Sequence, residues 1–193
     1  MREGELLGLR WSDVDLQRGL IRVQKTLNWK VKPPILQDVK TDGSYRVVPV
    51  SSQTIAALND FGALTEQEKE FFLGEYTDQW RELVFKTRYG SPLEPSNLTR
   101  TFKALLIKAG LPRNVRIHDL RHTSATLGLY SGVDLKTVSD RLGHSGIGIT
   151  ADIYTHVSLS RQRDATQRIG SLLFGESGTE SRKHAKDHSE PER

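Results

Sequence analysis

The stretch IHDLRHTSAT, residues 117–126, gathers side chains that do chemistry. His118, Arg121 and His122 fall within about one and a half turns of a helix. The motifs RLGHSG and DIYTH follow further along the chain and add two histidines and a tyrosine. Two chemistries could use this combination. One is a metal site, and the other is a phosphate-binding cluster beside a tyrosine nucleophile.

The metal interpretation rests on His118 and His122, which are four residues apart and share one side of a helix. HDLRH resembles the zinc-protease pattern HExxH, in which the glutamate is the general base. Here the second position is Asp119, one methylene shorter, and Arg121 would place a cation beside a dication. The pattern therefore disfavours metal hydrolysis, and we expect no metal.

The phosphate interpretation begins with Arg121, whose guanidinium can donate two parallel hydrogen bonds to phosphate oxygens. Arg2 at the start of a helix and Lys40 beside an Asp-Gly turn are further candidate donors. Tyr154 lies off the centre of the apolar stripe of its helix, so its hydroxyl can be partly exposed. A tyrosine can attack phosphorus if cations spread the developing charge.

Composition limits the class of protein. The 193 residues include no cysteine, which excludes disulfides and thiolate sites. No apolar run is long enough for a membrane span and no signal-peptide pattern is present, so we expect a cytoplasmic protein. Net charge is +4, but residues 64–80 carry −4 and residues 81–170 carry +7. The basic part suits a polyanionic partner.

The pattern of elements predicts an α+β domain. Residues 3–9 form a short helix with leucines inward, and Ile21 and Val23 share one face of a strand. Asp42-Gly43 predicts a hairpin between ILQDVK and SYRVVPV. We therefore expect a three-stranded antiparallel sheet over residues 19–50.

The rest of the chain is predicted to be helical. A serine pair begins a helix near residue 51, the acidic stretch 64–80 is a helix or an insertion, and Pro95 starts a helix that Gly110 closes. Leu120 and Leu127 share one face of the next helix. Further helices are expected over 135–142, near 149–157 and over 159–174, followed by a disordered charged tail, 175–193.

The blocks MREGELLGLRWSDVD, VKTDGSYRVVPV, HDLRHTSATL, LGHSGIGIT and DIYTHV, read in order, resemble the catalytic domain of the tyrosine recombinases, the phage integrase family. The resemblance covers residues 1 to about 160. It implies a mainly helical catalytic domain with a small three-stranded sheet over residues 1–174. Family members usually carry an N-terminal DNA-binding domain, which we expect to be absent here through truncation.

The resemblance also implies residue roles. It assigns catalysis to Arg2, Lys40, His118, Arg121, His144 and Tyr154. Tyr154 would attack the scissile DNA phosphate and form a 3′-phosphotyrosine, with Lys40 as the general acid for the 5′ oxygen. Glu5 would support the first arginine, while His122 and His156 would have structural or positioning roles. No metal and no cofactor is implied.

Three functions stay open from the sequence. The first is a site-specific recombinase that integrates or excises a phage or mobile element, acting on double-stranded DNA as a homotetramer and monomeric without DNA. The second is nicking and closing of DNA in the manner of a type IB topoisomerase. The third is a non-catalytic DNA-binding remnant. The sequence does not identify the DNA target.

Overall fold

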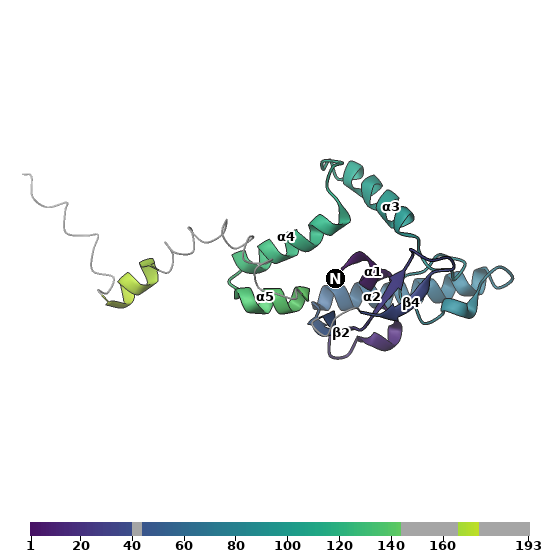
Figure 1. The fold of residues 1–193 in the computed structure, drawn as a ribbon, viewed down its shortest axis with the longest axis horizontal. Helices are drawn as coiled ribbons and strands as arrows, with labels where there is room; N and C mark the ends of the chain where they lie inside the picture. The colour runs from purple at the N-terminus through teal and green to yellow at the C-terminus, as the bar shows by residue number, and fades with distance from the viewer. Residues whose placement is uncertain (40–43, 144–165, 174–193) are drawn as a thin grey trace, which may run out of the picture.

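The computed structural model describes residues 1–39, 44–143 and 166–173, and these residues form an α+β fold (Figure 1). A body of short strands and two helices is followed by helices that lie to one side of it. The elements are α1 (Glu3–Leu7), η1 (Trp11–Asp13), β1 (Val14–Asp15), β2 (Leu20–Val23), β3 (Lys25–Asn28), β4 (Ile35–Asp38), β5 (Arg46–Pro49), α2 (Ser52–Phe71), η3 (Asp78–Trp80), α3 (Pro95–Lys108), α4 (Ile117–Tyr130) and α5 (Leu135–Leu142), and residues 166–173 are helical.

The strands form two small antiparallel sheets. One has three strands in the order β1-β2-β5, and the other pairs β3 with β4. A three-stranded antiparallel sheet was predicted and is confirmed, but its composition differs from the prediction. The first strand lies before residue 19, and the segment ILQD belongs to the second sheet.

The predicted hairpin around Asp42-Gly43 is wrong, because the segments on either side of it do not pair with each other. β5 pairs with β2, and β4 pairs with β3. The connection from β3 to β4 contains Pro33-Pro34, which the sequence predicted as a break in the chain. Prolines preset the backbone for a turn, and the chain reverses here between β3 and β4. Residues 40–43 lie outside the described residues.

The main core lies between the sheets, α1 and α2. Ile21 and Val23 alternate inward along β2, as predicted. α1 packs directly on β3 because Gly8 has no side chain: a Cβ there would come within 2.7 Å of the Leu27 backbone nitrogen. The buried hydrophobic cluster comprises Leu9, Ile21, Val23, Val39, Val48, Leu58 and Val84.

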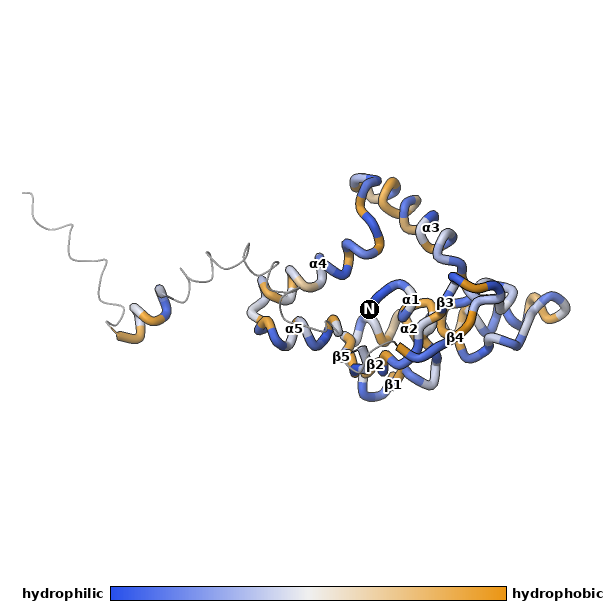
Figure 2. The backbone as a smooth tube through the Cα atoms, viewed as in Figure 1, coloured by the Kyte–Doolittle hydropathy of each residue, from blue (hydrophilic) through white to orange (hydrophobic). Residues whose placement is uncertain are grey.

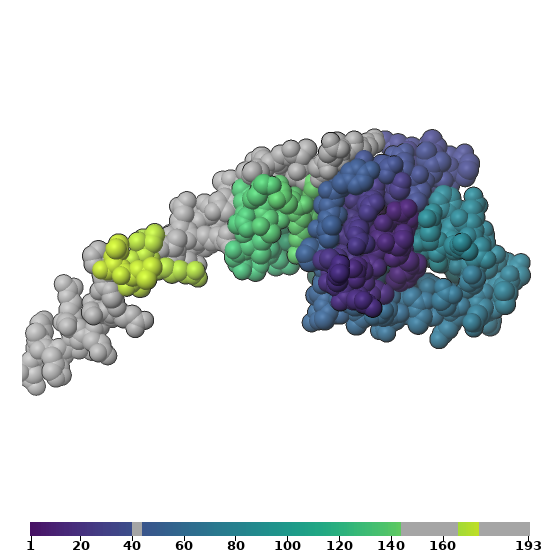
Figure 3. All heavy atoms as spheres, turned by 90° about the horizontal axis from the view of Figure 1, so that it is seen from below, coloured from purple at the N-terminus to yellow at the C-terminus, as the bar shows by residue number. Residues whose placement is uncertain are grey.

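A second, smaller core joins α4 to α5. It comprises Ala125, Leu129, Val138 and Leu142. Figure 3 shows this helix pair, in green, adjoining the body formed by α1, the strands and α2. Leu120 and Leu127, which share one face of α4 in the sequence, are 49% and 62% exposed, so they are not on its buried face. α4 instead buries Arg121, Ala125 and Leu129.

The predicted helix boundaries agree well with the structure in α3 and α5. Pro95 stands in the first turn of α3, and Gly110, which follows the helix, has a φ of +67°. α5 begins after Asp134, whose side chain accepts a hydrogen bond from the Thr137 N–H, and it ends at Gly143 in the left-handed conformation. α2 is longer than the sequence indicated, because it runs into the acidic stretch.

The outer helices leave apolar side chains in solvent. Figure 2 shows hydrophobic and polar positions interleaved along α3, where Leu105 and Ile107 are more than half exposed. In the helical segment 166–173, Ile169, Leu172 and Leu173 are also exposed. Among the described helices, none has both the length and the apolar character that crossing a bilayer requires.

Candidate phosphate-binding site

The first component of the site lies at the start of α1. Arg2 precedes this helix, and its Nη1 donates a hydrogen bond of 2.8 Å to Glu5 Oε1. The Arg2 backbone N–H donates to Glu5 Oε2 at 2.7 Å, so the carboxylate also fixes the entry to the helix. Arg2 is therefore tied to the fold by both its backbone and its side chain.

A second arginine, Arg46 of β5, binds the same carboxylate. Its Nη2 lies 2.7 Å from Glu5 Oε2 and its Nη1 lies 3.2 Å from Oε1. The side chains of Arg46 and Glu5 are only 6% and 3% exposed. The sequence analysis missed Arg46. The alternation of β5, with Val48 buried, would have placed Arg46 on the inner face and could have revealed it.

Arg121 enters from α4 and is 7% exposed. Its Nη2 donates to the carbonyl of Leu142, while its Nη1 is buried and has no hydrogen-bond partner among the described residues. A buried donor without a partner is costly, so Arg121 Nη1 is suited to donate to an oxygen of a bound ligand. A guanidinium N–H donates most strongly to an anionic oxygen.

The three arginines converge on the C-terminal end of α5. Arg46 Nε donates to the Arg141 carbonyl at 3.0 Å, Arg121 donates to the Leu142 carbonyl, and Arg2 Nη2 donates to the Gly143 carbonyl at 2.9 Å. The last carbonyls of a helix have no partner within it and carry partial negative charge. Cations at this end therefore satisfy them and hold the end of α5 against α1 and β5. The chain continues from here directly into His144.

The cluster carries an excess of positive charge. Three guanidinium groups face one carboxylate, which leaves two positive charges in excess among the described residues. Burial alone would raise the pKa of Glu5, but hydrogen bonds from Arg46 and Arg2 lower it to about 2. Burial and then the neighbouring charge of Arg2 lower the pKa of Arg121 to about 10, so Arg121 still carries its charge near pH 7. The site can therefore bind an anion.

His118 and His122 lie next to Arg121 on α4, and both are exposed. Their rings are 5.0 Å apart between centroids, in an edge-to-face arrangement. Burial, followed by His122 and Arg121, lowers the pKa of His118 below its ordinary value. His118 is therefore neutral near pH 7 and can accept a proton. Within residues 1–39, 44–143 and 166–173, no three His, Asp or Glu side chains gather as a metal ion would require.

The described residues bring together three of the predicted site residues, Arg2, Glu5 and Arg121. His118 and His122 lie beside Arg121 on the exposed side of α4. The remaining predicted residues lie outside the described residues: Lys40, His144, Tyr154 and His156.

Residues 1–161 match the family model described as the phage integrase family. The chain belongs to the phage integrase family. The match covers most of the 193 residues, including all nine residues that the sequence analysis assigned to the site.

Curated relatives of this integrase-family chain include recombinases of bacteria and phages. It is 39% identical to a tyrosine recombinase XerC-like protein of Caldanaerobacter subterraneus subsp. tengcongensis, over 90% of this chain and 47% of the relative. It is 28% identical to the integrase of Staphylococcus phage L54a, over 90% of this chain and 49% of the relative. The chain therefore spans about half the length of the curated relatives it matches.

Solved structures agree on the fold. The Tn1549 transposon integrase in complex with transposon right end DNA matches with a TM-score of 0.71 and 23% identity, over 88% of this chain and 55% of that chain. The XerA recombinase matches with a TM-score of 0.63 and 29% identity, over 86% and 52%. The predicted fold class, the catalytic domain of the tyrosine recombinases, is thereby confirmed.

Proposed function

We propose that this chain is the catalytic domain of a site-specific DNA recombinase that integrates or excises a phage or mobile element. The observation that carries the proposal is the buried arginine cluster with the unpartnered Nη1 of Arg121. Family membership supports the reaction class, since relatives are named tyrosine recombinases and integrases. The proposed partner is double-stranded DNA.

The charge of the cluster suits the transition state better than the ground state. A phosphodiester carries one negative charge, and attack by a tyrosine oxygen that loses its proton gives a phosphorane with two. The excess of two positive charges around Glu5 matches the two negative charges of the phosphorane. Groups that match the charge developing in the transition state accelerate a reaction, because they bind it more tightly than the substrate.

The proposed reaction has two transesterification steps. The Tyr154 hydroxyl oxygen attacks the scissile phosphorus, its proton passes to His118, and the bond to the 5′ oxygen breaks. Lys40 protonates that oxygen, which leaves as a 5′-hydroxyl, and a 3′-phosphotyrosine remains. A 5′-hydroxyl of the partner strand then attacks the phosphorus, and Tyr154 leaves. One phosphoester bond replaces another at each step, so the proposed reaction needs no ATP. The arginines stabilise the developing negative charge, so it is proposed to need no metal.

The arginines and histidines have separate proposed tasks. Arg2 and Arg121 hold the non-bridging oxygens, and His144 donates a further hydrogen bond to the phosphate. Glu5 orients Arg2, which is supported by their 2.8 Å hydrogen bond. His122 and His156 are proposed to position their helices.

We propose a homotetramer on two DNA sites and a monomer without DNA, working at the nucleoid in the bacterial cytoplasm. The exposed Ile169, Leu172 and Leu173 support an assembled state, because apolar side chains gathered in one short helical segment favour burial against another surface.

Covalent trapping tests the proposed function. The protein is mixed with a nicked suicide DNA duplex in EDTA, and the products are separated on a denaturing gel beside Tyr154→Phe. The expected result is a DNA-linked band that the variant lacks. Absence of the band from both proteins on every duplex tested would leave the DNA-binding remnant as the better description. Relaxation of supercoiled DNA without exchange between two sites would favour the topoisomerase-like activity.

A further inference from the structure

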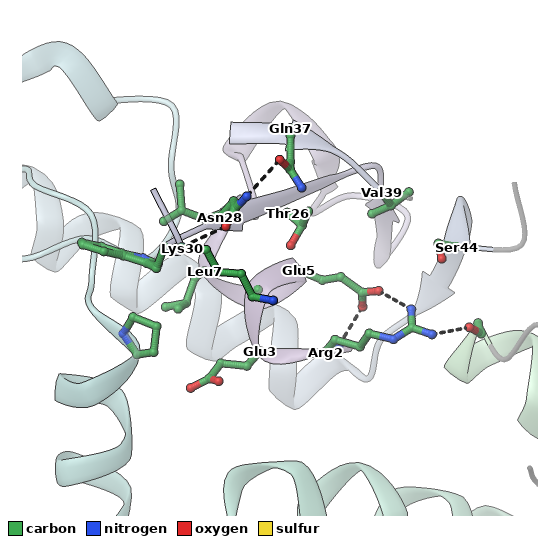
Figure 4. Close-up of a pocket in the computed structure, with 15 residues that line it drawn as sticks. Arg2, Glu3, Glu5, Leu7, Thr26, Asn28, Lys30, Gln37, Val39 and Ser44 are labelled. Atoms are coloured by element: carbon green, nitrogen blue, oxygen red, sulfur yellow. Dashed lines mark hydrogen bonds and ion pairs between the residues drawn. The ribbon is translucent and has the colours of Figure 1, made fainter. Parts of the chain in front are cut away.

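A groove of about 670 Å³ begins at Arg2 and is lined by α1, by the β3–β4 sheet and by Pro95 at the start of α3 (Figure 4). Arg2 lines one end, and Asn28, Trp29, Lys30 and Gln37 line the part formed by the β3–β4 sheet. Its volume lies within the range of about 300–1,000 Å³ found for ligand pockets. The proposed reaction uses only the arginine end, so most of the groove has no assigned role.

Two amide side chains form the polar wall of the groove. Asn28 of β3 donates from Nδ2 to Gln37 Oε1 on β4 at 3.3 Å, and Asn28 Oδ1 accepts from the Lys30 N–H at 2.9 Å (Figure 4). Asn28 is thereby held in one orientation, and it holds Gln37 in turn. Gln37 keeps its amide N–H₂ group without a partner among the described residues, and its oxygen keeps a second lone pair.

The indole N–H of Trp29 is a buried donor in the lining of the same groove, and it has no hydrogen-bond partner among the described residues. Buried donors are nearly always paired, so this one is consistent with a ligand that brings acceptors. Lys30 at the same end is exposed and adds a positive charge.

We propose that this groove reads the edge of one nucleobase next to the scissile phosphate, with Gln37 as the residue that determines specificity. The inference rests on the proposed function, since it needs a DNA phosphate at Arg2 and Arg121. A donor and an acceptor side by side on one amide pair with the N7 and N6 of adenine, whereas a phosphate or a metal ion would use only one of them. The base is therefore adenine.

A selection on DNA tests this base contact. The full chain is incubated with a nicked duplex library whose base pairs beside the nick are randomised, and the covalently captured DNA is sequenced. The wild-type protein should enrich adenine at one position beside the cleaved phosphate by about fivefold or more. Gln37→Ala should lose that preference. Gln37→Glu should move it to cytosine, because a carboxylate accepts from the cytosine amino group.

The control variant is Gln17→Ala, which removes an exposed amide outside the groove and should keep the adenine preference. The move to cytosine in Gln37→Glu is a gain that a misfolded protein could not produce. Identical base preferences in wild type, Gln37→Ala and Gln37→Glu would overturn the inference.

The same library is also selected for noncovalent binding to Tyr154→Phe, which separates the two proposals. Adenine preference in that complex without covalent capture by wild type would reject the transesterase and keep the base contact. Covalent capture with no adenine preference in either selection would keep the transesterase and reject the base contact. The base contact would also be rejected if DNA bound without base preference, or if neither protein bound DNA.

Discussion

Glu5→Gln is the change that probes the arginine cluster most sharply. The substitution keeps the shape of the side chain and removes the one negative charge that Arg2 and Arg46 share. Breaking a buried ion pair by removing one partner typically costs about 3–5 kcal/mol, because the remaining charge is left uncompensated. The fall in the pKa of Glu5 from 4.5 to about 2 gives an independent value of about 3 kcal/mol.

Urea unfolding at pH 7 measures this loss. Glu5→Gln should lower the free energy of unfolding by about 3 kcal/mol, while Asp60→Asn, which removes an exposed carboxylate on α2, should change it by less than about 0.5 kcal/mol. Arg46→Met should cost less in the Glu5→Gln background than in the wild type, because the two groups interact. A loss below about 1 kcal/mol for Glu5→Gln would show that Glu5 does not stabilise the fold as a buried ion-pair partner, since exposed surface pairs already contribute that much.

The difference in unfolding free energy between wild type and Glu5→Gln should decrease as the pH falls. The pKa of Glu5 is lowered in the folded protein, so its contribution to stability is fully present above about pH 4.5 and is lost as the pH falls towards 2. The gap in unfolding free energy between wild type and Glu5→Gln should therefore narrow over that window. A gap that stays constant from pH 5 to pH 2 would mean that another group carries the stabilisation.

Three further substitutions follow from the geometry. Arg121→Lys should slow covalent adduct formation on the order of 10²–10³-fold in single-turnover assays, because a lysine lacks the paired donors of the buried guanidinium; an unchanged rate would remove Arg121 from the site. Gly143→Ala should lower the free energy of unfolding by at least about 1–2 kcal/mol. Gly143 has a φ of +68°, and a Cβ there would lie 2.8 Å from Arg46 Nη1. Thermal unfolding measures the effect, and an equal or higher Tm would contradict the prediction. Leu129→Ala should cost about 2–5 kcal/mol because Leu129 is fully buried between α4 and α5; urea unfolding measures it, and a loss below about 1 kcal/mol would show that the two helices do not form a core.

Local signals in the sequence were sufficient for the parts of the fold that depend on neighbouring residues. The limits of α5 follow from a capping residue and a glycine stop, and β2 follows from alternation of Ile21 and Val23. The pairing of strands was not predictable in this way. Both Asp42-Gly43 and Pro33-Pro34 can reverse a chain. Which segments pair depends on contacts between distant parts of the chain, such as the pairing of β2 with β5.

In the site, too, the sequence predicted features that depend on local motifs and did not predict contacts between distant residues. Motif order proposed Arg2 and Arg121 as site residues, and the structure brings their side chains to the same end of α5. Motif order did not predict which residues hold them. Arg46 carries no motif, and its role arises from contacts with Glu5 and with the Arg141 carbonyl, which lies 95 residues away in the chain. Alternation along β5 could place Arg46 on the inner face, but it could not identify partners that far away in the chain. Leu120 and Leu127 were also misleading, because α4 turns Arg121 inward and leaves these two leucines exposed.

We propose that the arginine cluster holds a DNA phosphate for attack by Tyr154, and mapping the covalent adduct tests this. The DNA-linked protein is digested with nuclease and trypsin, and the modified peptide is identified by mass spectrometry. We expect a nucleotide joined through a 3′-phosphate to Tyr154 in wild type, and a greatly reduced yield of the same peptide in Arg121→Lys. An adduct on another residue, or an undiminished yield in Arg121→Lys, would contradict it.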